Sequence, residues 1–206
     1  MQFILLSMNY LAHAFLSGED PEFLLGNVTA DLLKGNFHKS LSEKISAGVL
    51  HHRKIDVFTD NHPEFRSCLP ILYPQHGKYA SVVLDILFDY FLVKNWHLFN
   101  DHSLDTFCEK TNLLLLSGIS LLPANVEIQL KSMIQGNWLY HYGHQEGLTY
   151  CFLRLTKRVA QPDRLTNWQE TLDKKGEFLA TSFLNFFPEL IAYSKNEANL
   201  QNVMIS

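Results

Sequence analysis

The fold class is decided by the stretch Tyr79-Ala-Ser-Val-Val-Leu-Asp-Ile-Leu-Phe-Asp-Tyr-Phe-Leu-Val93, which is apolar on every face of a helix. A helix of this kind is buried on all sides, so the stretch predicts the centre of a helical core. It nevertheless carries Asp85 and Asp89, which are four residues apart and therefore lie on one face. Burying a carboxylate costs on the order of several kcal/mol, so a metal ion, a basic side chain or a bound proton must compensate.

Helical signals continue on both sides of this stretch, and no alternation typical of strands is present. Asp20-Pro21 predicts the start of a helix that runs to about residue 34, and Ser40-x-x-Glu43 is a capping box for a long helix that Pro63 limits. Further helices are expected after Pro63, from 78 to 99, after Ser103, from 123 to 142, over 145–159 and 163–187, and after Pro188. The sequence therefore predicts an all-α protein, a single compact helical domain of about eight or nine helices.

The composition narrows the class of protein. The chain has 206 residues, of which 47% are hydrophobic and only 18% are charged, against a usual charged share of about 25%. This excludes a disordered chain, and a net charge of -4 argues against a general nucleic-acid binder. The three cysteines fit neither a disulfide framework nor a zinc spacing, which favours a reducing compartment.

Two uncharged stretches raise the question of targeting or membrane insertion. Residues 1–18 lack charged side chains, but their apolar core is too short for a signal peptide and has no basic flank. The second stretch, 111–126, is interrupted by Gly118 and Pro123 before it could span a membrane. We therefore expect a cytoplasmic protein that does not insert into a membrane.

Polar residues four positions apart recur on three other predicted helices: His52, Asp56 and Asp60; Asn27 and Asp31; and Asn9 and His13. Each step of four residues turns the side chain by only about 40°, so each set forms one stripe along its helix. If the stripes converge, they create a pocket of aspartate and histidine within a helical bundle. Helical bundles build carboxylate-histidine metal sites in this way.

The residue types restrict the metal. The absence of a cysteine cluster argues against a thiolate zinc site. Aspartate oxygens mixed with histidine nitrogens suit Mn²⁺, Mg²⁺ or Fe²⁺ better than Ca²⁺. In such sites the ion activates water and neutralises phosphate oxygens, which predicts hydrolysis of a phosphoester.

Other readings of these residues remain open from the sequence. Asp85 and Asp89 could pair with basic side chains, although the chain has only five arginines. The stripe that begins at His52 could be a solvated helix face, since Arg53 and Lys54 adjoin it. In these cases the protein could be a helical binding module without enzymatic activity. A metal analysis of the purified protein distinguishes such a module from a metal-dependent enzyme.

Four motifs follow one another along the chain: Met8-Asn-Tyr-Leu-Ala-His13; Gly26-Asn-Val-Thr-Ala-Asp31 with Lys34-Gly-Asn36; His52-Arg-Lys-Ile-Asp-Val-Phe-Thr-Asp60; and Leu84-Asp-Ile-Leu-Phe-Asp-Tyr-Phe-Leu92. In this order and spacing they resemble the acyl carrier protein phosphodiesterase family, a divergent relative of the HD-type metal-dependent phosphohydrolases. The resemblance implies an HD-like helical bundle over residues 8–195, with an N-terminal extension of residues 1–7 and a polar tail of residues 196–206. The family often has histidine where this chain has Tyr90.

The resemblance also implies an activity. The family uses a divalent ion, typically Mn²⁺, to remove the 4′-phosphopantetheine arm from the serine of holo acyl carrier protein, which leaves the apo protein and belongs to lipid metabolism and fatty acid biosynthesis. The expected partner is holo acyl carrier protein, with no nucleic acid. The alternative is an HD-type phosphohydrolase that acts on a small nucleotide or another phosphoester.

Site residues follow from matching these motifs. The predicted metal ligands are Asp31, His52, Asp56, Asp60, Asp85 and Asp89. His52, Asp56 and His13 are the predicted catalytic residues, because a histidine poised near neutral pH can donate a proton to the leaving serine oxygen. Substrate binding is predicted for Lys34, Arg53, Lys54 and Arg158, and Arg154 and Lys157 belong to the same second basic group as Arg158.

Overall fold

Ten α-helices, joined by short 3-10 turns, make up the part of the chain that the structure describes. The structure is a computed structural model that describes residues 9–33 and 35–205, apart from the side chains of residues 37, 38 and 198–205. The helices are α1 (Tyr10–Phe15), α2 (Pro21–Thr29), α3 (Glu43–Asn61), α4 (Pro63–His76), α5 (Ala80–Lys94), α6 (Leu104–Gly118), α7 (Ala124–Gln135), α8 (Gln145–Thr156), α9 (Asp163–Thr166) and α10 (Trp168–Ile205). These residues include no strand, so the all-α prediction is confirmed.

Helix α5 occupies the centre of the core, as its apolar sequence predicts. It contacts α1, α4, α10 and the 3-10 segment η6 (Trp138–Gly143). Its apolar residues on opposite faces, among them Val83, Leu84, Ile86 and Leu87, have no exposed surface. Because α5 is enclosed, the polar side chains that it carries must be accommodated inside the protein.

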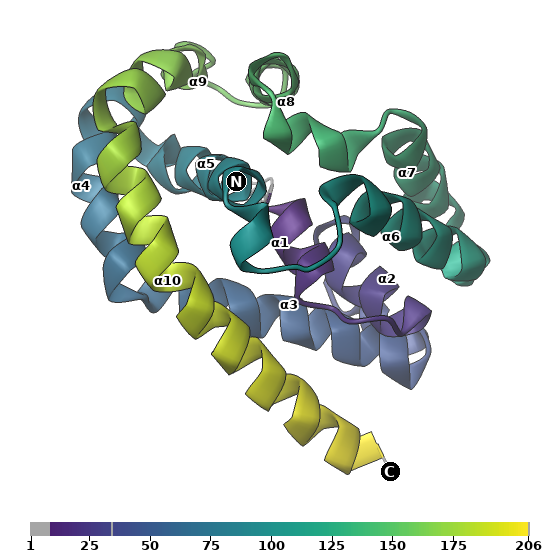
Figure 1. The fold of residues 1–206 in the computed structure, drawn as a ribbon. Helices are drawn as coiled ribbons and strands as arrows, with labels where there is room; N and C mark the ends of the chain where they lie inside the picture. The colour runs from purple at the N-terminus through teal and green to yellow at the C-terminus, as the bar shows by residue number, and fades with distance from the viewer. Residues whose placement is uncertain (1–8, 34, 206) are drawn as a thin grey trace.

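Helix α10 runs along α3, α4 and α5 on one side of the molecule (Figure 1). The predicted helix end at Pro188 is wrong, since α10 continues through this proline and on to Ile205, beyond the start of the predicted tail at residue 196. A proline inside a helix costs about 3 kcal/mol, but here Phe183, Phe187 and Leu190 are buried on either side of it. Their packing outweighs the local penalty.

The proline-rich region after Pro63 shows the same effect. Helix α4 continues through both Pro70 and Pro74, where the sequence predicts only a short helix. Its buried residues Phe65, Cys68 and Leu72 share one face and hold the helix against the core.

Helices α2 and α3 pack unusually close together, and two glycines allow it. A Cβ atom built on Gly26 would lie 2.0 Å from the Ile45 carbonyl oxygen, and one on Gly48 would lie 2.1 Å from the Phe23 carbonyl oxygen. Any larger residue would therefore push the two backbones apart. The close approach brings the α3 stripe that begins at His52 against the end of α2.

Several helix ends match the sequence signals and two do not. Asp20 caps α2 and Ser103 caps α6 as predicted, whereas α3 is capped by Ser42 instead of Ser40. The helix from residue 123 stops at Gln135, well before residue 142, because Asn137 takes a left-handed conformation with φ 49°. The chain then forms η6, which packs against α5 and α8.

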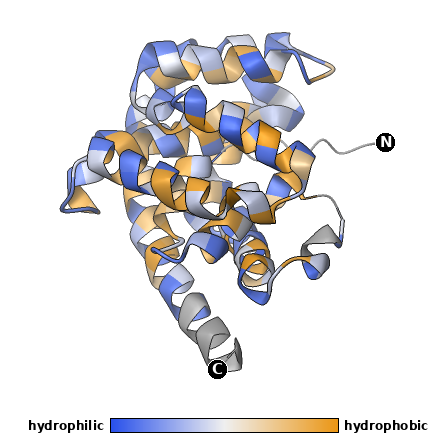
Figure 2. Cartoon of the chain, turned by 90° about the vertical axis from the view of Figure 1, so that its right-hand side faces the viewer, coloured by the Kyte–Doolittle hydropathy of each residue, from blue (hydrophilic) through white to orange (hydrophobic). Residues whose placement is uncertain are grey.

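Hydrophobic and hydrophilic positions alternate around the helices of the bundle (Figure 2). Within the described residues, no helix combines the length and apolarity that a membrane span requires. The three cysteines, Cys68, Cys108 and Cys151, are buried and unpaired.

Candidate active site

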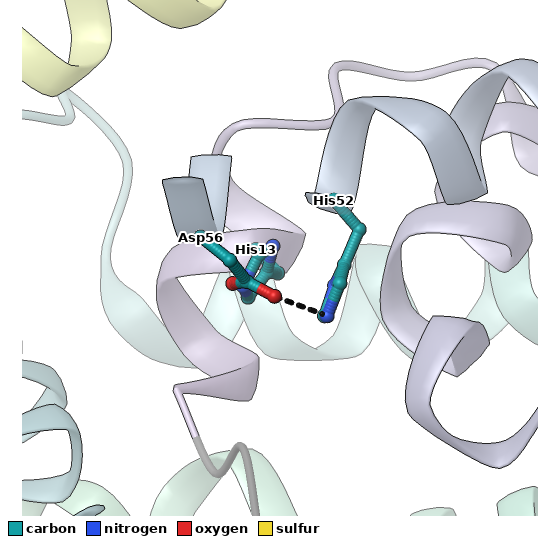
Figure 3. Close-up of side chains that lie close together, drawn as sticks. All are labelled: His13, His52 and Asp56. Carbon is teal, nitrogen blue, oxygen red and sulfur yellow. Dashed lines mark ion pairs between the residues drawn. The ribbon is translucent and has the colours of Figure 1, made fainter. Parts of the chain in front are cut away.

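His13, His52 and Asp56 form a cluster at the junction of α1 and α3 (Figure 3). The Nε2 atom of His13 lies 3.2 Å from one Asp56 carboxylate oxygen, and the Nε2 atom of His52 lies 3.2 Å from the other. The two imidazole rings stack with their centroids 3.9 Å apart. One carboxylate thus bridges two histidines that come from different helices.

Asn27 on α2 orients both rings. Its side-chain amide group donates to the His13 carbonyl and to the Ser17 hydroxyl, which leaves its side-chain oxygen to accept from His13 Nδ1 at 2.9 Å. The Asn27 backbone carbonyl accepts from His52 Nδ1 at 2.8 Å. Because both Nδ1 atoms act as donors, both neutral rings present the lone pair of Nε2 to the cluster.

These inward-facing atoms are short of partners. The Nε2 atoms of His13 and His52 are buried, and apart from their ion-pair contacts with Asp56 and Asp31 they make no hydrogen bond to the described residues. One oxygen of Asp31 also lacks a hydrogen bond to these residues. Buried polar atoms without partners are costly and rare in proteins. Together with the outer hydrogen bonds that fix each ring, this is the arrangement found around metal-binding histidines.

Asp31 approaches the cluster from the side of His52. It lies in the 3-10 turn η1 (Ala30–Leu32) that follows α2, and one of its oxygens is 3.5 Å from His52 Nε2. Its side chain is only 8% exposed, whereas that of Asp56 is 30% exposed. Asp56 therefore faces the opening of the site and Asp31 lies deeper.

The charges within the cluster are strongly coupled. Burial opposes a positive charge on His52, but Asp31 and Asp56 outweigh it and raise the pKa of His52 to about 10. Burial and the neighbouring His52 lower the pKa of His13. Burial works against a negative charge on Asp56, yet its bonds to the two histidines hold the pKa of Asp56 well below its usual value. The carboxylates and the imidazoles at this site thus act on one another: the carboxylates raise the pKa of His52, and the imidazoles lower the pKa of Asp56.

Asp60 and Asp85 add acidic groups beside the cluster. Asp60 is exposed one turn beyond Asp56 on α3, and partial burial and Asp56 raise the pKa of its carboxyl. Burial raises the pKa of Asp85 well above its usual value, and Asp56 and Asp60 raise it further. Asp85 accepts no hydrogen bond from the described residues, so its carboxylate is left facing other negative charges.

Asp89 has a different environment from Asp85, although both lie on one face of α5. Its two oxygens accept hydrogen bonds from the backbone N–H groups of Leu11 and Ala12, at 3.0 Å and 2.9 Å. The side chain is 1% exposed. Asp89 thus holds the start of α1, which carries His13, in place. Its predicted role as a metal ligand stays a prediction, and its observed contacts are those of a positioning residue.

Two alternative readings of the acidic residues disagree with the structure. Among the described residues, no lysine or arginine forms an ion pair with the five aspartates of this region: Asp31, Asp56, Asp60, Asp85 and Asp89. The His52 stripe is solvated only toward its far end, since His52 is 2% exposed whereas the Asp56 side chain is 30% exposed and Asp60 is exposed. Within the described residues, the basic side chains that face Asp31 and Asp56 are the histidines His13 and His52, not lysine or arginine.

The predicted substrate-binding cations are scattered. Lys34 lies outside the described residues. Arg53 is exposed and donates to the Gly35 carbonyl at 3.2 Å, and Lys54 pairs with Glu197 on α10. Arg158 is elsewhere, at the edge of a pocket beside the cluster.

This pocket, a cavity of about 310 Å³ between η6, α7 and α8, was not expected from the sequence. Its wall includes Tyr10, Trp138, Tyr142 and Tyr150, with Arg154 and Arg158 at the rim. Sequence reasoning placed the tryptophans in the core by default. One sequence signal could have indicated this pocket: the aromatic run 138–142 precedes a helix that carries basic residues at 154, 157 and 158. The sequence contains no sign that Tyr10 lies next to this region.

Comparisons with known proteins identify the family of the chain. The profile of the acyl carrier protein phosphodiesterase family matches residues 8–190. The acyl carrier protein phosphodiesterase of Serratia proteamaculans is 27% identical over 191 residues, which cover 92% of this chain and 99% of the relative. That of Yersinia enterocolitica is 28% identical with the same coverage, and that of Escherichia coli O139:H28 is 29% identical over 93% of this chain and all of the relative.

No solved structure matches the chain significantly. The family profile, in contrast, covers nearly all of the helices described above, including every residue of the cluster. The chain therefore belongs to the acyl carrier protein phosphodiesterase family, whose members are named as hydrolases of phosphodiester bonds.

Proposed function

We propose that this protein hydrolyses the phosphodiester bond between the 4′-phosphopantetheine arm and its serine in holo acyl carrier protein, leaving the apo protein. Membership of the family supports the reaction class, because the relatives carry the name acyl carrier protein phosphodiesterase. One observation carries the assignment of the site: the Nε2 atoms of His13 and His52 converge on the two oxygens of Asp56.

The donor set fits a divalent ion, for which we propose Mn²⁺, with Mg²⁺ or Fe²⁺ as alternatives. Two ligands about 2.1 Å from one ion and at a right angle to each other lie about 3.0 Å apart. The separations of 3.2 Å between each Nε2 atom and Asp56 are close to this value. His13, His52 and Asp56 would hold the ion, with Asp31 beside His52. An ion bound there supplies a Lewis acid for phosphate oxygens and lowers the pKa of water.

The protein's own residues prepare the site for this chemistry. Asn27 fixes both imidazole rings with their Nε2 atoms inward, and Asp89 anchors α1 so that His13 stays in register with His52. A nitrogen that binds an ion cannot also donate a proton. Because both histidines would present Nε2 to the ion, neither could protonate the leaving serine oxygen while the ion is bound, and their proposed role is to hold the ion.

Recognition of an acidic partner requires a local basic surface, because the whole chain carries a net charge of -4. Arg154, Lys157 and Arg158 are exposed and form no ion pair with a described residue. We propose that these three cations face carboxylates of the carrier protein. Unpaired cations of this kind mainly raise the association rate and orient the partner.

The test is conversion of holo to apo carrier protein by purified protein. The protein is stripped with a chelator, then supplied with Mn²⁺, Mg²⁺ or no metal, and the loss of the arm is followed by mass spectrometry. We expect conversion with Mn²⁺ and none without metal. Intact holo carrier protein after incubation with the Mn²⁺-loaded enzyme would contradict the proposal.

A parallel screen distinguishes the alternative substrate class. Small nucleotides and other free phosphoesters are supplied to the same Mn²⁺-loaded enzyme. We expect turnover of the carrier protein and little of the free esters. The reverse pattern would favour a phosphohydrolase of small molecules.

A further inference from the structure

The pocket between η6, α7 and α8 lies directly beside the cluster. Two segments connect them. Tyr10 lines the pocket and lies three residues before His13 on α1, which corresponds to a rise of about 4.5 Å along one helix face. Leu32 lines the pocket and follows Asp31 in the chain. A ligand whose phosphate lies at the cluster can thus extend into the pocket.

The electrostatic environment of Tyr10 supports the same placement. Burial and the nearby Asp31 raise the pKa of Tyr10 to about 12, while Arg158 and Arg154 act in the opposite direction. Tyr10 is thus close enough to Asp31 and to the two arginines of the pocket to be influenced by both. Its ring packs edge-on against Trp138, with the centroids 5.0 Å apart.

One polar group of the pocket wall has no partner. Trp138 is 5% exposed, and its indole N–H, which is a donor only, makes no hydrogen bond to the described residues. A buried indole N–H usually finds an acceptor. The unsatisfied donor in a pocket wall predicts that the natural ligand brings a carbonyl or hydroxyl oxygen.

The size and the lining of the pocket restrict this ligand further. A volume of about 310 Å³ is at the lower end of the range for small-ligand sites. The wall combines apolar groups such as Leu32, Met133 and Leu155 with the hydroxyl-bearing Tyr10 and Tyr150. Such a lining suits an uncharged chain that carries methyl groups, hydroxyls and amides.

On the basis of the proposed function, we infer that this pocket is the subsite for the pantetheine part of the arm, with Trp138 donating to one of its oxygens. Pantetheine has a dimethyl group, a hydroxyl and two amides, so it matches both the apolar wall and the unsatisfied indole. The subsite explains how the enzyme holds the arm while the phosphate lies at the cluster.

The first experiment observes Trp138 directly. The chain has three tryptophans, so a ¹H–¹⁵N spectrum shows three indole signals, and Trp138→Phe identifies the one of interest. We expect free pantetheine to shift the Trp138 signal in metal-free protein. Trp96 already donates to the His102 carbonyl at 2.8 Å, so its signal should stay in place as the internal reference.

The second experiment uses a blocking variant that leaves the core intact. Ser132 is exposed on α7 and lines the pocket, so Ser132→Trp should fill it, whereas Ser117→Trp on exposed α6 surface is the matched control. We expect Ser132→Trp to raise the KM for holo carrier protein about tenfold and to abolish the pantetheine-induced shift. Ser117→Trp should change neither quantity.

The outcomes separate the subsite from the proposed function. Suppose that the enzyme is active but that pantetheine does not shift the Trp138 signal and Ser132→Trp does not change the KM. This result would overturn the subsite and leave the proposed function intact. A shift caused by inorganic phosphate but not by pantetheine would also overturn it, since the pocket would then bind anions. An inactive enzyme that still binds pantetheine would overturn the proposed function and retain the subsite.

Discussion

The cluster and the pocket are neighbouring regions, but they differ in how their polar groups are held. In the cluster, buried polar groups hold one another in place: Asn27 orients both histidines, and Asp89 anchors the helix that carries His13. In the pocket, the cations at the rim are exposed and unpaired, and the indole of Trp138 lacks an acceptor. The residues proposed for the chemistry are therefore held in place inside the protein, whereas those proposed for recognition have groups that a ligand would complete.

The largest expected effect comes from replacing the residue that bridges the two histidines. Asp56→Asn keeps the shape of the side chain but removes its negative charge, so we expect activity to fall about 10²–10⁴-fold and Mn²⁺ binding to weaken. Rates with holo carrier protein and metal titrations measure the two effects. Asp173→Asn, at an exposed position on α10, is the control. Full activity in Asp56→Asn would contradict the assignment of Asp56 to the active site.

Next in size is a change at the helix crossing that brings the cluster together. Gly48→Ala places a Cβ atom against the Phe23 carbonyl, so α2 and α3 must separate. We expect a loss of about 3 kcal/mol in the free energy of unfolding together with reduced activity, since Asn27 no longer meets His52. Denaturant unfolding measures the loss of stability, and the rate with holo carrier protein measures the loss of activity. Gly136→Ala, whose added Cβ meets its nearest atom only at 3.3 Å, should cost far less.

A smaller effect is expected from removing the Asn27 side chain, which orients the His13 ring but is not among the proposed ligands of the ion. Asn27→Ala deletes three hydrogen bonds, including that from His13 Nδ1. Loss of an outer partner of this kind typically weakens metal affinity or activity about 10–100-fold. Ser17→Ala, which removes only one acceptor of the Asn27 amide, should cost less. Equal losses in the two variants would mean that Asn27 supports packing alone.

The smallest effect belongs to the pocket rim. Arg158→Ala removes one exposed cation, so we expect the KM for holo carrier protein to rise a few-fold, with the difference shrinking at high salt because ions screen exposed charges. The turnover number should hardly change. Lys44→Ala is the control, because Lys44 is exposed and already paired with Asp20. A change in the turnover number instead of the KM would mean that Arg158 takes part in the chemical step. The pocket rim would then not serve recognition alone.

Much of the cluster could be predicted because its signals are local. The spacing of His52 and Asp56 places both on one face of α3, and the motif at His13 belongs to the adjoining helix. The distinction between Asp85 and Asp89 could not be predicted. Both have the same helical spacing and the same apolar neighbours, and only the start of α1, packed across α5, decides that Asp89 accepts two backbone hydrogen bonds.

Periodicity and composition within single segments are enough to predict that the chain is helical, that its central helix is buried and that acidic groups are buried with it. Tertiary structure alone decided which partners those groups meet. It also decided that α4 and α10 continue through their prolines and that Tyr10 joins residues 128–158 around one cavity. The physical reason is that packing energy between distant segments outweighs local preferences, and no spacing along the chain records which distant segments will touch.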